Sequence, residues 1–261
     1  MNKRISSTFD TLKANGEKAL IAFITGGDPD METTEKLILA MEEAGVDFIE
    51  IGVPFSDPIA EGDVIQAADK RALDAGCTLD KLFAMVNRLR EKTNIPLLFM
   101  TYANPIYAYG TERFMATCKD VGIDGIIVPD VPFEEKGEFE DECSRYGIDM
   151  IALIAPTSGE RAEKIAREAK GFLYCVSSLG VTGVRSDIQT DIADVITQVR
   201  RVSSIPCAVG FGISTPKQAR DMAAVSDGVI VGSAIVQMVA EFGGGCIEPV
   251  KAFVREMKDA I

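Results

Sequence analysis

Glu50 is the residue whose position in this sequence most strongly suggests chemistry. Its neighbours Phe48, Ile49 and Ile51 favour a buried β-strand, in which an ionised carboxylate costs several kcal/mol unless it is solvated or paired. A structural role would require hydrogen-bond partners that satisfy the buried acid. A functional role would make Glu50 an acid or base whose pKa is tuned at the end of a strand, and we favour this interpretation.

The residue types that are present narrow the chemistry further. The sequence contains no histidine, which excludes a histidine base and the usual zinc sites. Proton transfer near neutral pH must therefore come from carboxylates, tyrosine, lysine, cysteine or the backbone. The six cysteines have no C-x-x-C pair, which is typical of small buried residues in a reducing compartment rather than of disulfides: Cys77, Cys118, Cys143, Cys175, Cys207 and Cys246.

The charge balance limits the possible partners. The net charge of -13, from 27 basic and 40 acidic residues, disfavours binding to nucleic acid or to an anionic membrane, although a local site for a small phosphate is compatible with it. No apolar run is long enough to span a bilayer, and residues 1–9 lack the apolar core of a signal peptide. We therefore expect a cytoplasmic protein.

Two glycine-rich turns have the composition of a phosphate site. Residues 209–214 read Val-Gly-Phe-Gly-Ile-Ser and residues 231–235 read Val-Gly-Ser-Ala-Ile, each at the end of an apolar run. Such glycines can simply permit tight turns, but small residues also let the backbone approach a ligand, and Ser233 with the amides after Gly232 suits a phosphate dianion. We favour the phosphate site. A third polar loop, at 177–183, is either a lid or an exposed connection.

Apolar strand-like runs alternate with amphipathic stretches along the chain. A helix at 4–15 precedes the first strand and is expected to close one end of the fold. Two helices follow the second strand, at 64–75 and 79–92, and two follow the last, at 232–242 and 248–261. Asn104 and Pro105 predict a turn before a helix at 111–121. The predicted strands are 19–25, 48–51, 95–101, 125–128, 149–154, 172–176, 206–209 and 228–231.

Eight parallel strands, each followed by a helix, most simply close into an α/β fold of the (β/α)8 TIM barrel type. This barrel would have an extra N-terminal helix, extra helices after strands 2 and 8, and its site at the carboxyl ends of the strands. A doubly wound open sheet more often has a G-x-G-x-x-G turn after its first strand, which Thr-Gly-Gly-Asp-Pro at 25–29 does not match. No linker divides the chain, so residues 1–261 are expected to form a single domain.

Seven short motifs, spread over the chain, match one known family. They are Glu-Ile-Gly-Val-Pro-Phe-Ser-Asp-Pro at 50–58, Gly62 with Ile65 and Gln66, Tyr-Ala-Asn at 102–104, Pro-Asp-Val-Pro at 129–132, Gly-Val-Thr-Gly at 180–183, Gly-Phe-Gly-Ile-Ser at 210–214 and Gly-Ser-Ala at 232–234. With them the chain resembles the alpha subunit of tryptophan synthase over essentially its whole length. The resemblance implies a barrel that cleaves indole-3-glycerol phosphate to indole and glyceraldehyde 3-phosphate.

The resemblance also implies roles for partners and residues. No metal or organic cofactor is required, and indole passes to a beta subunit in an alpha-beta-beta-alpha assembly. Glu50 matches the acid/base that moves protons in the retro-aldol cleavage, and Glu61 matches the second acid, which accepts the indole N–H. The remaining matches are Phe23, Tyr102, Tyr174 and Phe211 near the indole ring or the acids, Thr182 in the lid, Gly180, Phe211, Gly212, Gly232 and Ser233 at the phosphate, and Asp57, Asn104 and Pro132 on the partner face.

The loop that carries the second acid departs from the family pattern. The family reads Ala-Asp-Gly-Pro where this chain reads Ala-Glu-Gly-Asp at 60–63. Glu61 is one methylene longer, and Asp63 frees the backbone and adds a negative charge, which favours a mobile loop and a raised pKa of Glu61. Two alternatives therefore stay open: a weakly active or non-catalytic homologue that serves as a phosphate-binding, activating subunit, and a barrel enzyme for another phosphorylated substrate, such as an isomerase.

Overall fold

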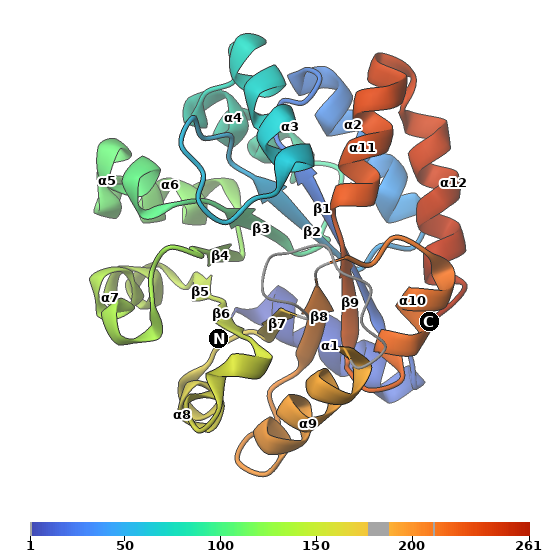
Figure 1. Ribbon diagram of the computed structural model, residues 1–261. Coiled ribbons are helices and arrows are strands. Elements are labelled where there is room, and N and C mark those ends of the chain that lie inside the picture. The colour runs from blue at the N-terminus through green and yellow to red at the C-terminus, as the bar shows by residue number, and fades with distance from the viewer. Residues whose placement is uncertain (1, 177–187, 211) are drawn as a thin grey trace.

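The sheet at the centre of the molecule is a ring of parallel strands. The computed structural model describes residues 2–176, 188–210 and 212–261, with the backbone alone at 188–191. Over these residues nine parallel strands form one sheet in the order β5-β4-β3-β2-β1-β9-β8-β7-β6, and Figure 1 shows them surrounded by the helices. Their bounds are β1 Ala19–Thr25, β2 Phe48–Gly52, β3 Leu97–Met100, β4 Gly125–Ile127, β5 Asp149–Met150, β6 Ala152–Ile154, β7 Leu173–Val176, β8 Cys207–Gly210 and β9 Gly228–Val231.

β5 and β6 are two pieces of the predicted fifth strand, divided at Ile151. β5 pairs with β4 and β6 pairs with β7, while the Ile151 amide donates a hydrogen bond of 2.8 Å to the Ile126 carbonyl. The chain therefore bends without leaving the sheet, and the ring follows the eight-strand path of a (β/α)8 barrel. The predicted fold class is confirmed, with the strand at 149–154 in two pieces instead of one.

Helices follow the strands as the sequence predicts, with one addition. α5 occupies Ala103–Tyr109, directly after β3, where Asn104 and Pro105 predicted only a turn. This prediction was wrong because a proline in the first turn of a helix removes an amide that has no partner within the helix. None of the described helices is long and apolar enough to cross a membrane. The others are α1 Lys3–Asn15, α2 Met31–Glu43, α3 Asp63–Asp74, α4 Leu79–Leu89, α6 Thr111–Val121, α7 Gly137–Tyr146, α8 Arg161–Glu168, α9 Ile188–Arg200, α10 Pro216–Ala223, α11 Ser233–Phe242 and α12 Ile247–Lys258, with short turns η1 Phe133–Glu135, η2 Pro156–Ser158 and η3 Gly243–Gly245.

The helix α1 closes the amino-terminal end of the barrel, as the sequence predicts. Its buried side carries Ile5, Phe9 and Leu12, which pack with inward-facing residues of the strands. The ring centroid of Phe9 lies 4.8 Å from that of Phe48 on β2 and 5.7 Å from that of Phe172, just before β7. Such aromatic pairs contribute about 0.5–1.5 kcal/mol each beyond their burial. The functional residues must therefore lie toward the other end, where the strands finish.

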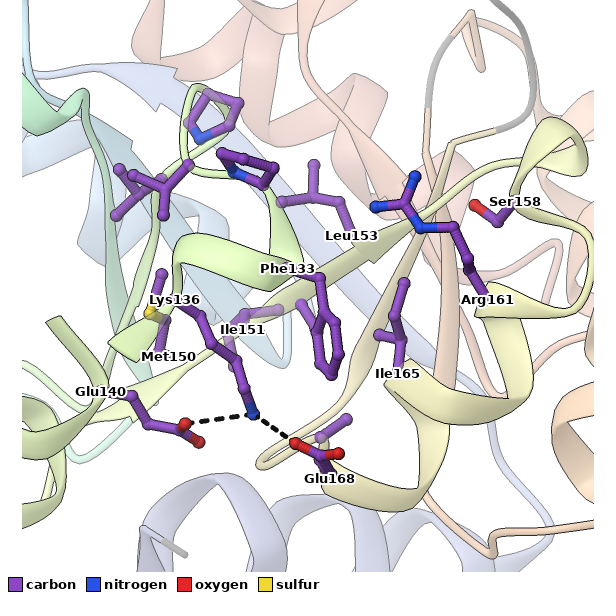
Figure 2. Close-up of a pocket in the computed structure, with 16 residues that line it drawn as sticks. Phe133, Lys136, Glu140, Met150, Ile151, Leu153, Ser158, Arg161, Ile165 and Glu168 are labelled. Atoms are coloured by element: carbon purple, nitrogen blue, oxygen red, sulfur yellow. Dashed lines mark ion pairs between the residues drawn. The ribbon is translucent and has the colours of Figure 1, made fainter. Parts of the chain in front are cut away.

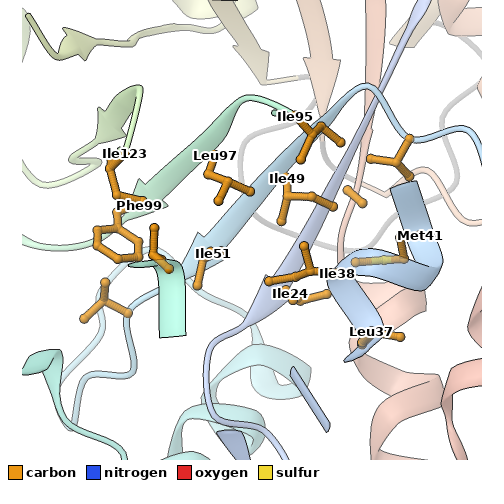
Figure 3. Packing of buried hydrophobic residues seen from close by; sticks show 14 of the residues in the cluster. Ile24, Leu37, Ile38, Met41, Ile49, Ile51, Ile95, Leu97, Phe99 and Ile123 are labelled. Atoms are coloured by element: carbon orange, nitrogen blue, oxygen red, sulfur yellow. The ribbon is translucent and has the colours of Figure 1, made fainter. Parts of the chain in front are cut away.

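The outward faces of the strands pack against the surrounding helices. Ile49 and Ile51 of β2 are fully buried, and Figure 3 shows them in one cluster with Leu97 of β3 and with Ile38 and Met41 of α2. Strands that are covered on both faces need apolar residues at successive positions. This requirement explains why β2 is apolar throughout except at Glu50.

A buried aspartate ties α1, α4 and the start of β3 together at the closed end. Asp124 is fully buried, and its carboxylate is 2.7 Å from the guanidinium of Arg90 and 2.8 Å from that of Arg4. It also accepts a hydrogen bond of 3.0 Å from the Leu97 amide. Burying a carboxylate is tolerable here because cations and an amide compensate for the lost water.

Two more aspartates at this end are supplied with donors in the same way. Asp149 accepts a hydrogen bond of 2.8 Å from the Asn2 amide, at the start of α1. Asp47 accepts one of 2.7 Å from the Leu20 amide and lies 2.8 Å from the Lys258 ammonium of α12. The acids at the closed end thus hold the two termini of the chain against the barrel.

Candidate active site

Glu50 lies in the middle of β2, with Phe23 of β1 and Leu98 of β3 at the paired positions. These neighbours, and Phe48 two residues earlier, belong to clusters inside the barrel, so the side chain of Glu50 points inward. It is fully buried, and neither carboxylate oxygen has a hydrogen-bond partner among the described residues. Burial raises the pKa of Glu50 to about 8. The group therefore carries a proton near neutral pH and can donate it.

Tyr174 of β7 brings a phenol into the same interior. It is buried, and its pKa is raised by burial and by the negative charge of Glu50, so the two groups lie within electrostatic reach of each other. The ring fits because residue 210 on the neighbouring β8 is glycine: a Cβ atom there would lie 2.6 Å from the Tyr174 hydroxyl. The structure thus brings the predicted ring-contacting residue together with the acid.

Phe23 of β1 forms an apolar wall near the carboxyl ends of the strands. Its side chain is buried in a cluster with Ile65 of α3 and Val236 of α11. Two glycines make room for it, since a Cβ atom at Gly52 would lie 2.6 Å from its Cζ and one at Gly232 would lie 3.2 Å from its Cβ. Such a wall suits a flat apolar ring, in line with the prediction. Phe23 also packs in the hydrophobic cluster near the carboxyl ends of the strands.

Glu61 and Tyr102 meet across the loop that follows β2. The Tyr102 hydroxyl donates a hydrogen bond to Oε2 of Glu61 and accepts one of 2.9 Å from the Ala60 amide. The Nε2 amide of Gln66 donates a bond of 2.8 Å to the Glu61 carbonyl. The longer acid is therefore held in place by residues that the family motifs already single out, and its Oε1 atom is not engaged by Tyr102.

The pKa of Glu61 is raised to about 7, chiefly by burial and further by the negative charge of Asp130, while the amides of Glu61 and Ala60 lower it. The sequence predicted a raised pKa for a different reason, the added charge of Asp63. That reason was wrong, because Asp63 is exposed at the first residue of α3 and the like charge that acts on Glu61 is Asp130. Both the family's proline and this aspartate fit the first position of α3, since proline is favoured there and a negative charge complements the helix dipole.

The two glycine-rich turns are adjacent, because they follow the paired strands β8 and β9. Gly212 is exposed and has a φ of 77°, a conformation that favours glycine. Gly232 caps the amino terminus of α11, and Ser233 is its first residue. The first amides of a helix have no acceptor within it and carry the positive end of its dipole, so this end of α11 has the chemistry of an anion site.

Three predicted site residues lie outside the described residues: Gly180 and Thr182 in the proposed lid, and Phe211 between the two glycines of the first turn. Their assignments stay predictions.

Comparisons with known proteins decide the family. A family model described as "Tryptophan synthase alpha chain" matches residues 9–261. The chain is 48% identical over 260 residues to the tryptophan synthase alpha chain of Thermoanaerobacter sp. (strain X514), covering 99% of each, and 48% identical to that of Citrifermentans bemidjiense, covering 99% of this chain and 97% of the relative. The chain belongs to the tryptophan synthase alpha chain family.

Solved structures support the same assignment. The tryptophan synthase subunit alpha of Legionella pneumophila str. Paris superposes with a TM-score of 0.91 at 37% identity, covering 100% of this chain and 98% of that one. A chain of the tryptophan synthase complex of Pyrococcus furiosus gives a TM-score of 0.83 at 36% identity, covering 92% of this chain and 97% of that one. The family places this chain among the lyases of tryptophan biosynthesis.

The residues that the family resemblance assigns to a partner lie on one side of the barrel mouth. Asp57, Asn104 and Pro132 are all exposed and follow the neighbouring strands β2, β3 and β4. Ile59 and Tyr107 project from the same segments with 78% and 50% of their surface exposed. Sequence reasoning did not single out these two, although a large apolar residue among the turn residues at 57–62 is a usable signal.

Asp69 of α3 is a further buried acid that sequence reasoning missed. It lies on the buried side of the helix with Ile65, Ala68 and Ala72, four residues after Ile65. The helical spacing of those apolar residues could have shown that Asp69 shares their face.

A separate cavity of about 200 Å³ lies outside the barrel, between η1 and α8. Figure 2 shows Lys136 at its edge between Glu140 and Glu168, at 3.0 Å and 2.9 Å. Each of these three groups is already in an ion pair, and Glu140 also lies 3.3 Å from Lys170, so none of them is free to bind a ligand. The cavity contributes nothing to the site around Glu50.

Proposed function

We propose that this chain cleaves the carbon–carbon bond of indole-3-glycerol phosphate, releasing indole and glyceraldehyde 3-phosphate in the cytoplasm. The observation that carries the proposal is Glu50, a fully buried acid without a partner among the described residues, inside the barrel of a tryptophan synthase alpha chain family member. Burying an acid without a hydrogen-bond partner lowers the stability of the folded protein, which favours a chemical role for Glu50 over a structural one.

Glu50 acts as both acid and base in this proposal. With its pKa at about 8, it is protonated near neutral pH and gives its proton to C3 of the indole ring. The resulting carboxylate then takes the proton of the hydroxyl on the adjoining glycerol carbon. The bond between C3 and that carbon breaks, its electron pair returns to the ring, and the hydroxyl carbon becomes the aldehyde of glyceraldehyde 3-phosphate.

Glu61 stabilises the ring while it carries positive charge. Protonation at C3 makes the indole N–H more acidic, and an ionised Glu61 can accept that hydrogen bond. The Tyr102 hydroxyl donates a hydrogen bond to its Oε2 and so helps to orient the carboxylate. Phe23, Tyr102 and Tyr174 form the aromatic surroundings of the ring.

The phosphate of the substrate is assigned to the end of α11. Gly232 and Ser233 supply backbone amides at the helix terminus, and Gly212 lets the neighbouring turn approach. On the resemblance alone, we assign Gly180 and Phe211 to the phosphate site and Thr182 to the lid.

A tryptophan synthase beta subunit is the proposed partner, in an alpha-beta-beta-alpha assembly. The exposed residues Asp57, Asn104 and Pro132, with the apolar Ile59 and Tyr107, form a continuous set of segments on which it can dock.

The test is a steady-state assay of indole release from indole-3-glycerol phosphate, with and without a beta subunit, against a Glu50→Ala blank. We expect indole above the blank and more of it with the partner. Absence of indole in both arms would overturn the proposal in favour of a non-catalytic subunit, which we do not favour because Tyr102 already holds Glu61 in the site.

A further inference from the structure

Tyr102 holds Glu61 from the residue immediately before α5. Its hydroxyl donates a hydrogen bond to Glu61 and accepts one of 2.9 Å from the Ala60 amide. Serine, threonine, aspartate and asparagine are favoured before a helix, because a short polar side chain there accepts a bond from a free amide of the first turn. The Tyr102 side chain makes no such bond. The first turn of α5 therefore needs an acceptor from elsewhere in the chain.

Asp130 supplies that acceptor from the loop after β4, 27 residues beyond Ala103. Its two carboxylate oxygens lie 3.1 Å and 3.2 Å from the amide nitrogen of Ala103. A carboxylate is also favoured at this end of a helix, because it faces the positive end of the dipole. Ala103 is the first residue of α5 and follows Tyr102 directly. Asp130 thus fixes the backbone from which the Tyr102 side chain projects.

The Tyr102 ring is confined as well. It is 3% exposed, and its centroid lies 5.4 Å from that of the Phe55 ring. The hydroxyl is the atom of tyrosine farthest from the backbone, so a small change in the direction of the chain at residues 102 and 103 displaces it most. A displacement of about 1 Å in a catalytic group can cost roughly a hundredfold in rate.

A second acid contacts the same helix at its other end. Asp80 accepts a hydrogen bond of 2.8 Å from the hydroxyl of Tyr109, the last residue of α5. Both acids therefore hold α5, but only Asp130 does so beside Tyr102. Asp80 is the matched control for a general effect of losing an acid that contacts this helix.

We propose that Asp130 is a positioning residue for Glu61: its carboxylate holds the Ala103 amide and thereby directs the Tyr102 hydroxyl onto Glu61. The loops after the neighbouring strands β2, β3 and β4 then form one unit around this acid. The inference rests on the proposed function, because Glu61 is the acid assigned to the indole N–H.

The direct test does not depend on catalysis. Hydrogen exchange at the Ala103 amide and the 13C NMR signal of Tyr102 Cζ, assigned with Tyr102→Phe, are followed in each variant. Asp130→Ala is expected to speed exchange about tenfold and to shift the Tyr102 signal. Asp130→Asn, which keeps an oxygen acceptor, should preserve most of both, and Asp80→Ala should change neither.

An unmoved Tyr102 signal in Asp130→Ala would overturn the inference, whatever happens at the Ala103 amide. If the alanine variant does not fold, Asp130→Leu takes its place, since leucine has a similar size but no acceptor.

The activity arm is a double-mutant cycle, with kcat for indole release measured at the pH optimum of each variant. Asp130→Ala should lower kcat about tenfold with little change in KM, and Asp130→Asn should restore most of it. In the Tyr102→Phe background Asp130→Ala should add less than about twofold, because its effect passes through the lost hydroxyl. A fall of full size in that background would refute the inference.

Failure of the proposed function gives a different result. If the Tyr102 signal shifts in Asp130→Ala but the wild type releases no indole, the proposed function is wrong, and the contact by which Asp130 directs Tyr102 onto Glu61 stands.

Discussion

Buried acids at the closed end of the barrel have cation partners, whereas several buried acids at the mouth do not; Asp28, which is paired with Arg71, is the exception at the mouth. At the closed end Asp124 receives two guanidinium groups and an amide, and Asp47 receives an ammonium and an amide. At the mouth Glu50 has no partner among the described residues, and Glu61 and Asp69 each have a pKa raised to about 7, chiefly by burial. The closed end uses charge to hold the chain together, whereas the mouth keeps acids in a state that can exchange protons.

The sharpest test of this contrast is Glu50→Gln. We expect kcat for indole release to fall about a thousandfold, because a general acid/base is lost while shape and size remain. The free energy of unfolding should stay the same or rise at pH 7, since the amide removes an unsatisfied ionisable group. Urea denaturation beside the assay checks both. A large loss of stability would show that Glu50 is a structural acid instead.

Asp124→Ala is the counterpart at the closed end. Removing this carboxylate leaves Arg90, whose side chain is 11% exposed, without its anion, and we expect unfolding to become easier by about 3–5 kcal/mol. Activity of the folded fraction should remain near wild type. Asp74→Asn, on the surface, is the control and should change stability by less than about 0.5 kcal/mol. A drop in kcat at full stability would break the division between the two ends.

The dependence of stability on pH distinguishes the ends in a second way. The pKa of Glu50 is about 8 in the folded protein against an ordinary value of 4.5, so between these values the unfolded chain binds fewer protons than the folded one. This contribution to stability is complete below pH 4.5 and is lost as the pH rises toward 8, with a slope of up to about 1.4 kcal/mol per pH unit. The difference in unfolding free energy between wild type and Glu50→Gln should follow that slope; a flat difference would contradict the burial of Glu50.

The phosphate turn offers a smaller effect. Gly232→Val should weaken binding of glycerol phosphate about tenfold, because a Cβ atom there would lie 3.2 Å from Phe23 and larger groups block the approach of the ligand to the backbone. Gly244→Ala is a matched control, since a Cβ atom at that position meets nothing within 4 Å. Calorimetric titration of both variants checks the prediction, and equal affinities would remove Gly232 from the phosphate site.

The smallest change is expected for Glu61→Asp combined with Asp63→Pro, which restores the family pattern in the loop. Because Tyr102 already holds the longer acid, kcat should change by less than about threefold. An increase beyond tenfold in the steady-state assay would mean that Glu61 is misplaced and would favour the weakly active alternative.

Much of the fold could be predicted because its strands are covered on both faces. Apolar runs at 19–25 and 228–231 coincide with β1 and β9, since such strands need apolar side chains at every position. The helix α5 was missed because Asn104 and Pro105 favour turns locally and also suit the first turn of a helix. The break at Ile151 has no marker in the sequence, because it depends on how the two neighbouring strands diverge.

For the acids at the barrel mouth as well, features set by sequence neighbours could be predicted, and features set by residues far apart in the chain could not. Glu50 could be recognised because the apolar residues that predict a buried strand around it are its immediate neighbours in the sequence. The contact of Glu61 with Tyr102 and the influence of Asp130 join residues far apart in the chain, so no local pattern reports them. The burial of Asp69 could have been predicted from its helical spacing, because it lies four residues after Ile65 on the buried face of α3.

The plug formed by α1 has a consequence for synthesis of the chain. Ile5, Phe9 and Leu12 are synthesised first. Their partners come much later, since Phe9 packs on Phe172 and the Asn2 amide donates to Asp149. Until more than half of the polypeptide has been made, the apolar side of α1 has only part of its final cover. A chain whose synthesis stops before Phe172 therefore leaves part of the apolar side of α1 exposed. Such incomplete chains are expected to aggregate unless chaperones bind them.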